Sequence, residues 1–297
     1  MPKTGRRVPT VARAVLLGLA VVLGVAAGGP PRLGAEAPMP DLVELRPASF
    51  LYRASGAFTR AERPAPAPLL RVRLRPALAM MRRQVTAADY QRCVAAGQCA
   101  PLASAAPPAD RPVVKVSWRD AEAYARWFSR ATGIRFRLPS DEEWAYAAGS
   151  RFADDVLAEG GDGADPGERE LVRYERDTER AAAVDKELRP VGGFGVNEQG
   201  LLDMAGNVWE WTESCFRRGA LDAAGSIAKA SVDCGIRVVE GRHRAYISDF
   251  IRDARGGGCS VGTPPAYLGF RLVRDDDPWQ ALRRIGEALG LADAADR

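Results

Sequence analysis

The chain contains one histidine, His243, and five cysteines, so few of its side chains are suited to metal binding or nucleophilic catalysis. A single imidazole excludes every metal site that needs two or more histidines. Serine–histidine or cysteine–histidine catalysis is restricted to one place in the sequence. Catalysis of that kind would have to involve the segment around His243.

Four of the five cysteines are placed for two short-range disulfides. Cys93 and Cys99 flank a short loop that contains a glycine. Cys215 and Cys234 flank a longer segment. In an oxidising compartment we expect these two pairs, each contributing about 2–4 kcal/mol, with Cys259 left as a free thiol. The alternative is that they are buried thiols, which is the expectation for a chain that stays in the cytosol.

The composition describes a globular chain without a strong charge. Of 297 residues, 46% are hydrophobic, which is enough for one large domain or two small ones. The charged fraction of 27% excludes a disordered polyelectrolyte and a membrane bundle. The 42 basic and 38 acidic residues give a net charge of only +4, so nucleic acid is not expected as a partner.

Residues 1–27 have the pattern of a secretory signal peptide. Basic side chains between Lys3 and Arg13 precede an uninterrupted apolar stretch from Ala14 to Ala27. That stretch is short for a bilayer span, which takes about 20 residues. We therefore expect a Pro/Gly/Ala linker at residues 28–40 and a periplasmic or secreted protein with no membrane span after signal cleavage. The alternative is an uncleaved membrane anchor.

Three helices are indicated by capping boxes, in which a Ser or Thr is followed three residues later by an acidic residue. The second predicted helix also has an apolar stripe at helical spacing from Ala121 to Phe128. The three boxes, and the glycines expected to end the helices, lie at 86–89 with Gly97, 117–120 with Gly133, and 140–143 with Gly149.

The remaining segments predict short strands and much irregular structure. Residues 150–190 are charged and are expected to form a solvated loop, and residues 276–297 a polar helical tail. The whole pattern indicates an α+β chain. The predicted strands lie at 42–45, 71–75, 113–116, 136–138 and 270–273.

Several long motifs occur in an order that is similar to the formylglycine-generating enzyme, or sulfatase-modifying factor, superfamily. The resemblance covers residues 41–275 and implies an α+β domain that is a large variant of the C-type lectin-like fold. The motifs are ERP (62–64), DRPVVKVSW (110–118), YARWFSRATG (124–133), RLPSDEEWAYAAG (137–149), GLLDMAGNVWEW (200–211) and LGFRLVRD (268–275).

Within the superfamily the chain most resembles the NirV group. These are exported proteins encoded beside copper nitrite reductases, and their role is described as accessory. The segments that resemble this group are MMRRQVTAADYQRC (80–93), AAGSRFADD (147–155) and RVVEGRHRAYISDFIRDARGGGCSVGTPPAYLGFRLVRD (237–275).

The enzymes of the superfamily hold Cu(I) between two cysteines, and this chain departs from that pattern. The resemblance places the two cysteine positions at about His243 and Ser248. Neither residue is a thiolate, the soft ligand that Cu(I) prefers, and serine is a poor copper ligand, so copper is not expected and no catalytic residue is assigned. His243, Ser248 and Cys259 stay as candidates in the cleft, because one thiol and one imidazole can still bind a metal.

The resemblance implies a structural calcium site in the segment 203–210. It assigns side-chain oxygens to Asp203 and Glu210 and backbone carbonyls to Gly206 and Val208. Calcium accepts such carboxylate and carbonyl oxygens at variable geometry. The alternative is a tight turn in which the two carboxylates cap backbone amides without any metal.

Two further features of the C-terminal half have a structural and a functional interpretation. Trp209 and Trp211 are expected to pack in the core, with a lectin-like sugar platform as the alternative. A basic cluster could line the cleft and attract an anion or an acidic peptide, unless its members are scattered surface arginines that pair with Asp249 and Asp253. The cluster consists of Arg242, His243, Arg244, Arg252 and Arg255.

These observations lead to three functional hypotheses. The first is an exported, non-catalytic accessory protein that assists a periplasmic copper nitrite reductase in maturation or electron supply. The second is a divergent metal-dependent oxidase that uses His243 and Cys259. The third is a peptide- or ligand-binding module that uses the basic segment 242–255.

Overall fold

The computed structural model describes residues 1, 37–74, 78–103, 105–152, 187–253 and 267–275. The chain divides into two compact units, Met1–Leu33 and Gly34–Arg297, and the described helices and strands all belong to the second. Most of the predicted signal peptide, linker and charged loop, together with Cys259, Arg255 and the C-terminal tail, lie outside the described residues. Within those ranges, no helix is both long and apolar enough to cross a bilayer.

A small antiparallel sheet joins the first and last strands of the described domain. Its strand order is β1-β6-β12-β7, so the C-terminal strand lies between two strands from the N-terminal half. The strands are β1 (Leu42–Leu45), β6 (Leu78–Met81), β12 (Val273–Arg274) and β7 (Phe136–Arg137).

The largest sheet is built on a long antiparallel hairpin, β8 (Trp209–Leu221) and β9 (Ile227–Glu240). The pairing of the hairpin is irregular between Trp211 and Phe216, where the register shifts. Two strands run parallel to β8 and the others complete the edges in the order β10-β9-β8-β3-β4. These strands are β10 (Ala245–Ser248), β3 (Ala57–Arg60), β4 (Arg63–Ala65) and β11 (Leu268–Gly269).

A separate two-stranded sheet pairs β2 (Ser49–Arg53) with β5 (Leu69–Arg73). The predicted strand at 71–75 is therefore present, shifted two residues toward the N-terminus. The predicted strands at 42–45 and 136–138 are also confirmed.

The three predicted helices are present, with the predicted boundaries. They are α1 (Ala87–Ala95), α2 (Trp118–Thr132) and α3 (Asp141–Ala148), and a short 3-10 turn, η1 (Gly149–Arg151), follows α3. In each helix the Ser or Thr accepts the amide of the acidic residue, whose carboxylate accepts the amide of the cap. Such boxes satisfy amides that the first helical turn leaves without partners.

The core is formed where α2 packs on the largest sheet. The apolar stripe of α2 is buried, and Tyr124 lies against Phe128, Trp127 and Phe270 with ring centroids 5.3–5.7 Å apart. Trp211 is fully buried in the same cluster and donates its indole N–H to the carbonyl of Val116 over 2.9 Å. Burial of such aromatic side chains is the main stabilising term of a domain of this kind.

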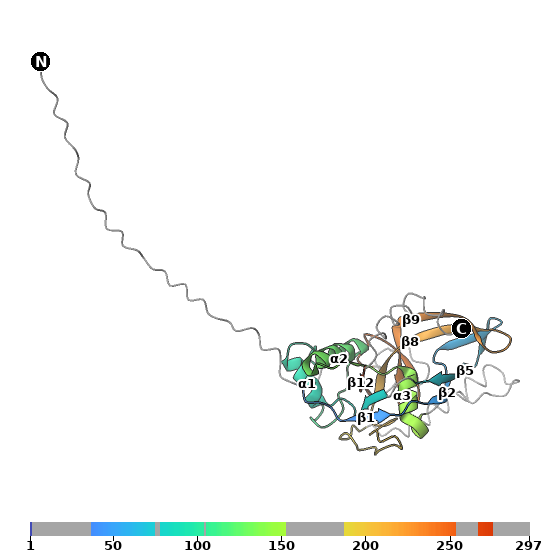
Figure 1. Cartoon of the computed structure of the whole chain (residues 1–297), viewed down its shortest axis with the longest axis horizontal. Helices are drawn as coiled ribbons and strands as arrows, with labels where there is room; N and C mark the ends of the chain where they lie inside the picture. The colour runs from blue at the N-terminus through green and yellow to red at the C-terminus, as the bar shows by residue number, and fades with distance from the viewer. Residues whose placement is uncertain (2–36, 75–77, 104, 153–186, 254–266, 276–297) are drawn as a thin grey trace. The chain divides into compact units, whose positions relative to one another are not determined.

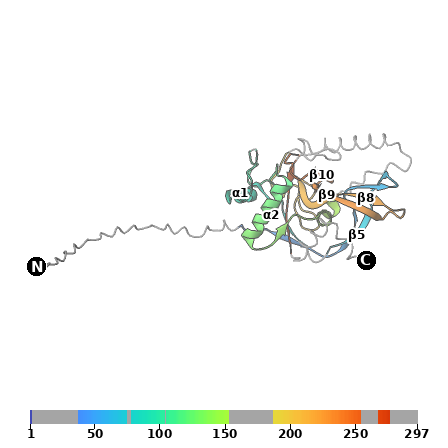
Figure 2. The same ribbon diagram turned by 90° about the horizontal axis from the view of Figure 1, so that it is seen from above.

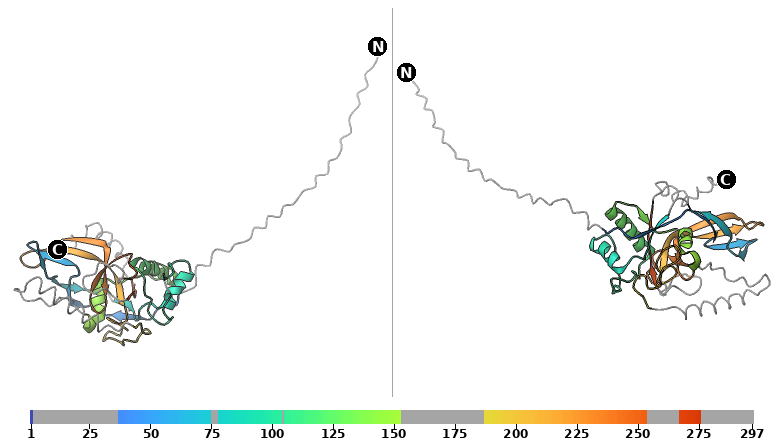
Figure 3. Two further views of the ribbon diagram at one scale, coloured as in Figure 1. Left: turned by 180° about the vertical axis from the view of Figure 1, so that it is seen from behind. Right: turned by 60° about the horizontal axis from the view of Figure 1, so that its bottom comes forward.

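The views agree on how these elements are arranged within the unit. In Figure 1, α1 and α2 lie at one end, and β8, β9 and β5 lie at the other. Figure 2, seen from above, shows the same separation, with β10 and β9 between the helices and the tip of the hairpin. Figure 3 shows it from behind and from below. The hairpin therefore extends away from the helical end.

The strand predicted at 113–116 is wrong. Val113, Val114 and Val116 are all buried, but Lys115 has a positive φ of 59°, which breaks an extended backbone. The amide of Val113 bonds to the carbonyl of Val85 by a single contact of 2.9 Å instead of joining a ladder.

The strand predicted at 270–273 is also wrong in its extent. Leu268–Gly269 pairs with β8, whereas Val273–Arg274 pairs with β6 and β7. The residues between them pass from one sheet to the other, and Arg271 turns inward to meet a buried carboxylate. The α+β class and the large share of irregular structure are confirmed.

Candidate functional site

His243 lies in the connection between β9 and β10 and packs against the core. Its ring meets Trp209 edge to face at 5.3 Å, and its carbonyl accepts the indole N–H of Trp209 over 3.0 Å. Its Nδ1 lies 3.0 Å from the carbonyl oxygen of Arg244. Ser248 ends β10, half-buried opposite Ile236.

The described residues do not assemble a metal centre around these candidates. Across the ranges that the structure covers, no group of three or more His, Cys, Asp or Glu side chains is placed to hold a metal ion. Cys259, the third cleft candidate, lies outside those ranges.

Both predicted disulfides are confirmed. Cys93–Cys99 has a Cα–Cα distance of 5.3 Å, and Cys215–Cys234 one of 4.6 Å. With both formed, four of the five cysteines are paired and Cys259 is the one cysteine of the sequence left over. A single thiol cannot provide the two thiolates of the family's Cu(I) site, so the residues present do not fit that site.

Glu210, one of the predicted calcium ligands, is fully buried in an ion pair with Arg271. Arg271 Nε lies 2.7 Å from Oε2 and Nη2 lies 2.8 Å from Oε1. Gln84 Nε2 donates to Oε1 over 2.8 Å, and Trp144 Nε1 donates to Oε2 over 3.0 Å. Each of the two carboxylate oxygens of Glu210 therefore accepts hydrogen bonds from two donors of the protein.

Asp203 and the backbone of the same turn are also engaged by the protein. The Asp203 carboxylate accepts the amides of Gly192 and Phe194 over 2.5 and 2.8 Å. Burial raises the pKa of Asp203 in spite of these bonds. The Gly206 carbonyl accepts the amide of Val208 over 2.8 Å.

The predicted calcium ligand set therefore does not fit calcium as it is arranged here. A calcium ion needs six to eight oxygens, whereas the cation beside Glu210 is the Arg271 guanidinium. Asp203 caps backbone amides, which is the metal-free alternative for that carboxylate. This arrangement therefore leads to the opposite expectation from the resemblance, and a comparison of stability with calcium and with chelator tests the two.

A second buried ionic cluster, absent from the sequence-based prediction, joins β2, α3 and the β9–β10 hairpin. Arg244 Nε lies 2.8 Å from Glu240 Oε1, and Arg244 Nη2 lies 3.4 Å from Asp141 Oδ2. The Tyr52 hydroxyl donates to the same Asp141 oxygen. All four side chains are at least nine-tenths buried.

The charges in this cluster do not titrate independently. Burial raises the pKa of Glu240 well above its ordinary value, and the Asp141 carboxylate raises it further. Burial also opposes ionisation of Asp141, but the Arg244 charge and the hydrogen bonds outweigh it and lower its pKa. The ionised Asp141 carboxylate thus balances the charge of Arg244, and the Glu240 carboxyl keeps its proton more readily than an ordinary glutamate.

Two arginines of the predicted basic cleft at residues 242–255 are held by acidic side chains. Arg244 is buried in the cluster above. Arg252 pairs with Asp120 at the start of α2, with a shortest distance of 2.7 Å. Asp249 pairs with Arg119 over 2.9 Å rather than with an arginine of its own segment. These pairs fasten the segment to the N-terminus of α2.

Trp209 and Trp211 are both core residues, as predicted. Trp209 is 6% exposed and Trp211 is 0% exposed, and each indole N–H has a backbone carbonyl partner. Neither ring is available as a sugar platform.

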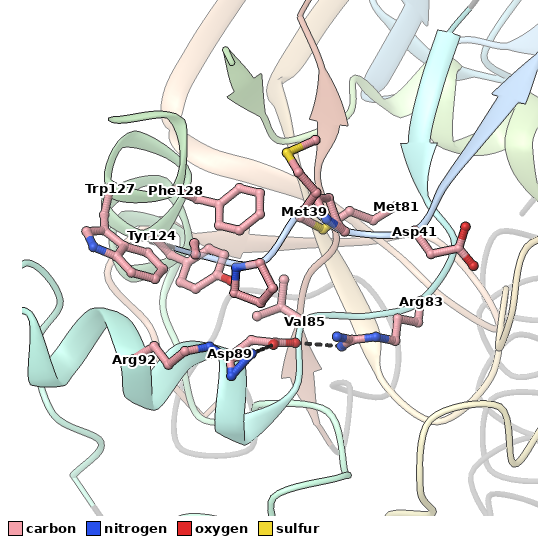
Figure 4. A pocket seen from close by; sticks show the side chains of 13 residues that line it. Met39, Asp41, Met81, Arg83, Val85, Asp89, Arg92, Tyr124, Trp127 and Phe128 are labelled. Carbon is pink, nitrogen blue, oxygen red and sulfur yellow. Dashed lines mark hydrogen bonds and ion pairs between the residues drawn. The ribbon is translucent and has the colours of Figure 1, made fainter. Parts of the chain in front are cut away.

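A pocket of about 240 Å³ opens where residues 37–41 cross α2 and the end of β6 (Figure 4). Tyr124, Trp127 and Phe128 from α2 form its aromatic side, and Met39 and Met81 add apolar surface. The α2 stripe was predicted from the sequence. The pocket was not, because its other wall comes from the end of the predicted linker.

The opposite side of this pocket is charged. Arg83 lies 2.5 Å and Arg92 2.7 Å from the carboxylate of Asp89, as Figure 4 shows for Arg83. The side chains of both arginines are 39% exposed. Asp41 lines the pocket as well, so its two arginines are balanced by two carboxylates, and it suits a small, mainly apolar molecule with polar groups.

The fold and the order of its motifs define a sulfatase-modifying-factor-like domain. The family model described as the sulfatase-modifying factor enzyme 1-like domain matches residues 31–276, and the chain belongs to this family.

Two curated relatives illustrate the range of the family. The chain is similar to the formylglycine-generating enzyme of Mycobacterium tuberculosis, with 41% identity over 185 residues that cover 56% of this chain and 58% of the relative. It is also similar to the inactive C-alpha-formylglycine-generating enzyme 2 of Mus musculus, with 37% identity over 113 residues, 37% of this chain and 34% of the relative. The chain spans about half the length of the formylglycine-generating enzymes that it matches.

A solved structure shares the fold. PvdO from Pseudomonas aeruginosa superposes with a TM-score of 0.51 at 23% identity, covering 80% of this chain and 94% of that protein.

Proposed function

We propose that this protein is an exported, non-catalytic member of its family that acts as an accessory protein. The observation that supports the proposal best is the state of its cysteines. Both disulfides consume their thiols, so the chain lacks the pair of free cysteines that the family's copper-dependent oxidation requires. Relatives whose names mark them as inactive are evidence that the fold persists without that chemistry.

Export is proposed from two features that point to the same compartment. Residues 1–27 have a signal-peptide pattern, and the two disulfides suit an oxidising space. The partner that we propose is a periplasmic copper nitrite reductase, because the sequence most resembles the NirV group. This protein would assist in the maturation of the reductase or in the supply of electrons to it.

Deletion of the gene in a denitrifying host tests this role. We expect lower nitrite reductase activity or lower copper content in the reductase, restored by the full chain. A chain without residues 2–27 is the matched control, because it stays in the cytosol and should not restore either quantity. Unchanged activity and copper content in the deletion strain would overturn the proposed partner.

A second candidate function, binding of a small, mainly apolar molecule, is favoured by the pocket beneath residues 37–41. The probe 8-anilinonaphthalene-1-sulfonate is small and aromatic with one polar group, and Trp127 provides a fluorescence signal at the site. We expect saturable quenching that Arg92→Gln weakens. Arg126→Gln, on the same helix but outside the pocket, should leave it unchanged. Quenching that does not saturate, or that both variants reduce equally, would contradict this candidate.

A further inference from the structure

The two disulfides of the protein lie in very different environments. Cys93 is 0% and Cys99 8% exposed, within the core beside α1. In contrast, Cys234 is exposed on β9 and Cys215 is half-buried on β8. An external thiol can therefore reach Cys234 without unfolding the domain.

Arg237 is held with its guanidinium against the sulfur of Cys215. Its Nη1 lies 3.1 Å from Cys215 Sγ and donates to the carbonyl of Glu213 over 2.7 Å. The guanidinium also lies over the ring of Trp118, 3.7 Å from the ring centre. Trp118 is itself fixed, because its indole N–H donates to the carbonyl of Thr212 over 3.0 Å. The cation is thus positioned by two contacts besides the sulfur, the Glu213 carbonyl and the Trp118 ring.

A cation in this position acts on the chemistry of the disulfide. In thiol–disulfide exchange a thiolate attacks one sulfur and the other leaves as a thiolate, and the reaction is faster when the leaving thiolate is stabilised. A neighbouring arginine stabilises a thiolate. The arrangement thus favours attack on the exposed sulfur and departure of the sulfur beside Arg237.

We propose that the Cys215–Cys234 disulfide is a thiol–disulfide exchange site for an external low-molecular-weight thiol, with Cys234 as the attacked sulfur and Cys215 as the leaving group. The external thiolate forms a bond to Cys234 Sγ, the Cys215–Cys234 bond breaks, and its electron pair stays on Cys215 Sγ. A second external thiolate then attacks the mixed disulfide, which reduces Cys234 and oxidises the two external thiols to their disulfide. This reactivity does not depend on the proposed accessory function.

Timed reaction with glutathione, followed by alkylation and peptide mass spectrometry, tests the proposal on the full oxidised protein. We expect Cys215–Cys234 to open about tenfold or more faster than Cys93–Cys99. The first product should have glutathione on Cys234 and the alkylating group on Cys215. Opening of both disulfides at one rate, or glutathione found first on Cys215, would overturn the proposal.

Arg237→Gln tests the part played by the cation. We expect it to slow opening of Cys215–Cys234 by about threefold or more, because the leaving thiolate loses its neighbouring charge, and Arg237→Lys to recover part of the rate. Arg218→Gln removes the same charge elsewhere on β8 and is the matched control. An unchanged rate in Arg237→Gln would overturn the role of Arg237. The rate at which the buried Cys93–Cys99 disulfide opens serves as a measure of unfolding in every variant. If the variants unfold, the proposal is still tested by which sulfur glutathione attacks in the unmodified protein.

Discussion

Glu210 and Arg271 form a bidentate ion pair with both side chains 0% exposed, 61 residues apart in the sequence. Arg271 also donates to the carbonyl of Leu202 over 2.9 Å, so the pair fixes the turn before β8 and the crossing between β11 and β12 at one point. The Arg271 guanidinium thus supplies a positive charge beside Glu210, a residue that the family resemblance assigned as a calcium ligand.

The ion pair should be essential for stability. Arg271→Met leaves the Glu210 carboxylate buried without its cation, and we expect a loss of about 3–5 kcal/mol in the free energy of unfolding, measured with urea. The exposed pair of Arg274 and Glu44 provides the control, because Glu44→Gln should cost less than about 1 kcal/mol. A loss in Arg271→Met no larger than that of the control would contradict a structural role for the pair.

Calcium should have little effect on the folded protein. Because Arg271 already neutralises Glu210, and Asp203 accepts two backbone amides, the turn does not need a metal for its stability. We expect the same melting temperature in excess calcium and in excess chelator. A melting temperature that calcium raises in the unmodified protein but not in Asp203→Asn would contradict this expectation and support the calcium site that the sequence predicted.

The pH dependence of stability should reflect Glu240. Its pKa in the folded state is raised, so above the ordinary value of 4.5 the folded protein holds a proton that the unfolded chain has released. The contribution of Glu240 to stability is therefore present at low pH and declines as pH rises from 4.5 toward the raised pKa.

Urea titrations between pH 5 and pH 8 measure this effect. We expect the free energy of unfolding to fall more steeply with pH in the unmodified protein than in Glu240→Gln. Glu122→Gln, on the exposed side of α2, should keep the slope of the unmodified protein. Equal slopes in Glu240→Gln and the unmodified protein would show that Glu240 is ionised in both states.

The parts of the fold that the sequence predicts correctly depend on short-range interactions. The capping boxes at Thr86, Ser117 and Ser140 need only four consecutive residues. One disulfide lies within a single hairpin, and the other links a helix to the turn that follows it. Local chemistry is sufficient for such features.

The parts that sequence reasoning missed depend on contacts between distant segments. Arg244 was assigned to a basic surface because the sequence does not show that Asp141, about a hundred residues earlier, lies beside it. Lys115 adopts a positive φ within an apolar run that is typical of a strand. The pocket over α2 was missed for the same reason, because Met39 reaches it from a segment far earlier in the sequence.

The central claim, that this member of the family performs no copper-dependent oxidation, is tested most directly on the purified oxidised protein. Copper content after loading with Cu(I), and oxidation of a cysteine peptide with a sulfatase motif in the presence of oxygen, can be measured on the same sample. We predict no stoichiometric copper after desalting and no formylglycine product. One copper per chain that is lost in both His243→Ala and Cys259→Ala, together with conversion of the peptide, would contradict the claim.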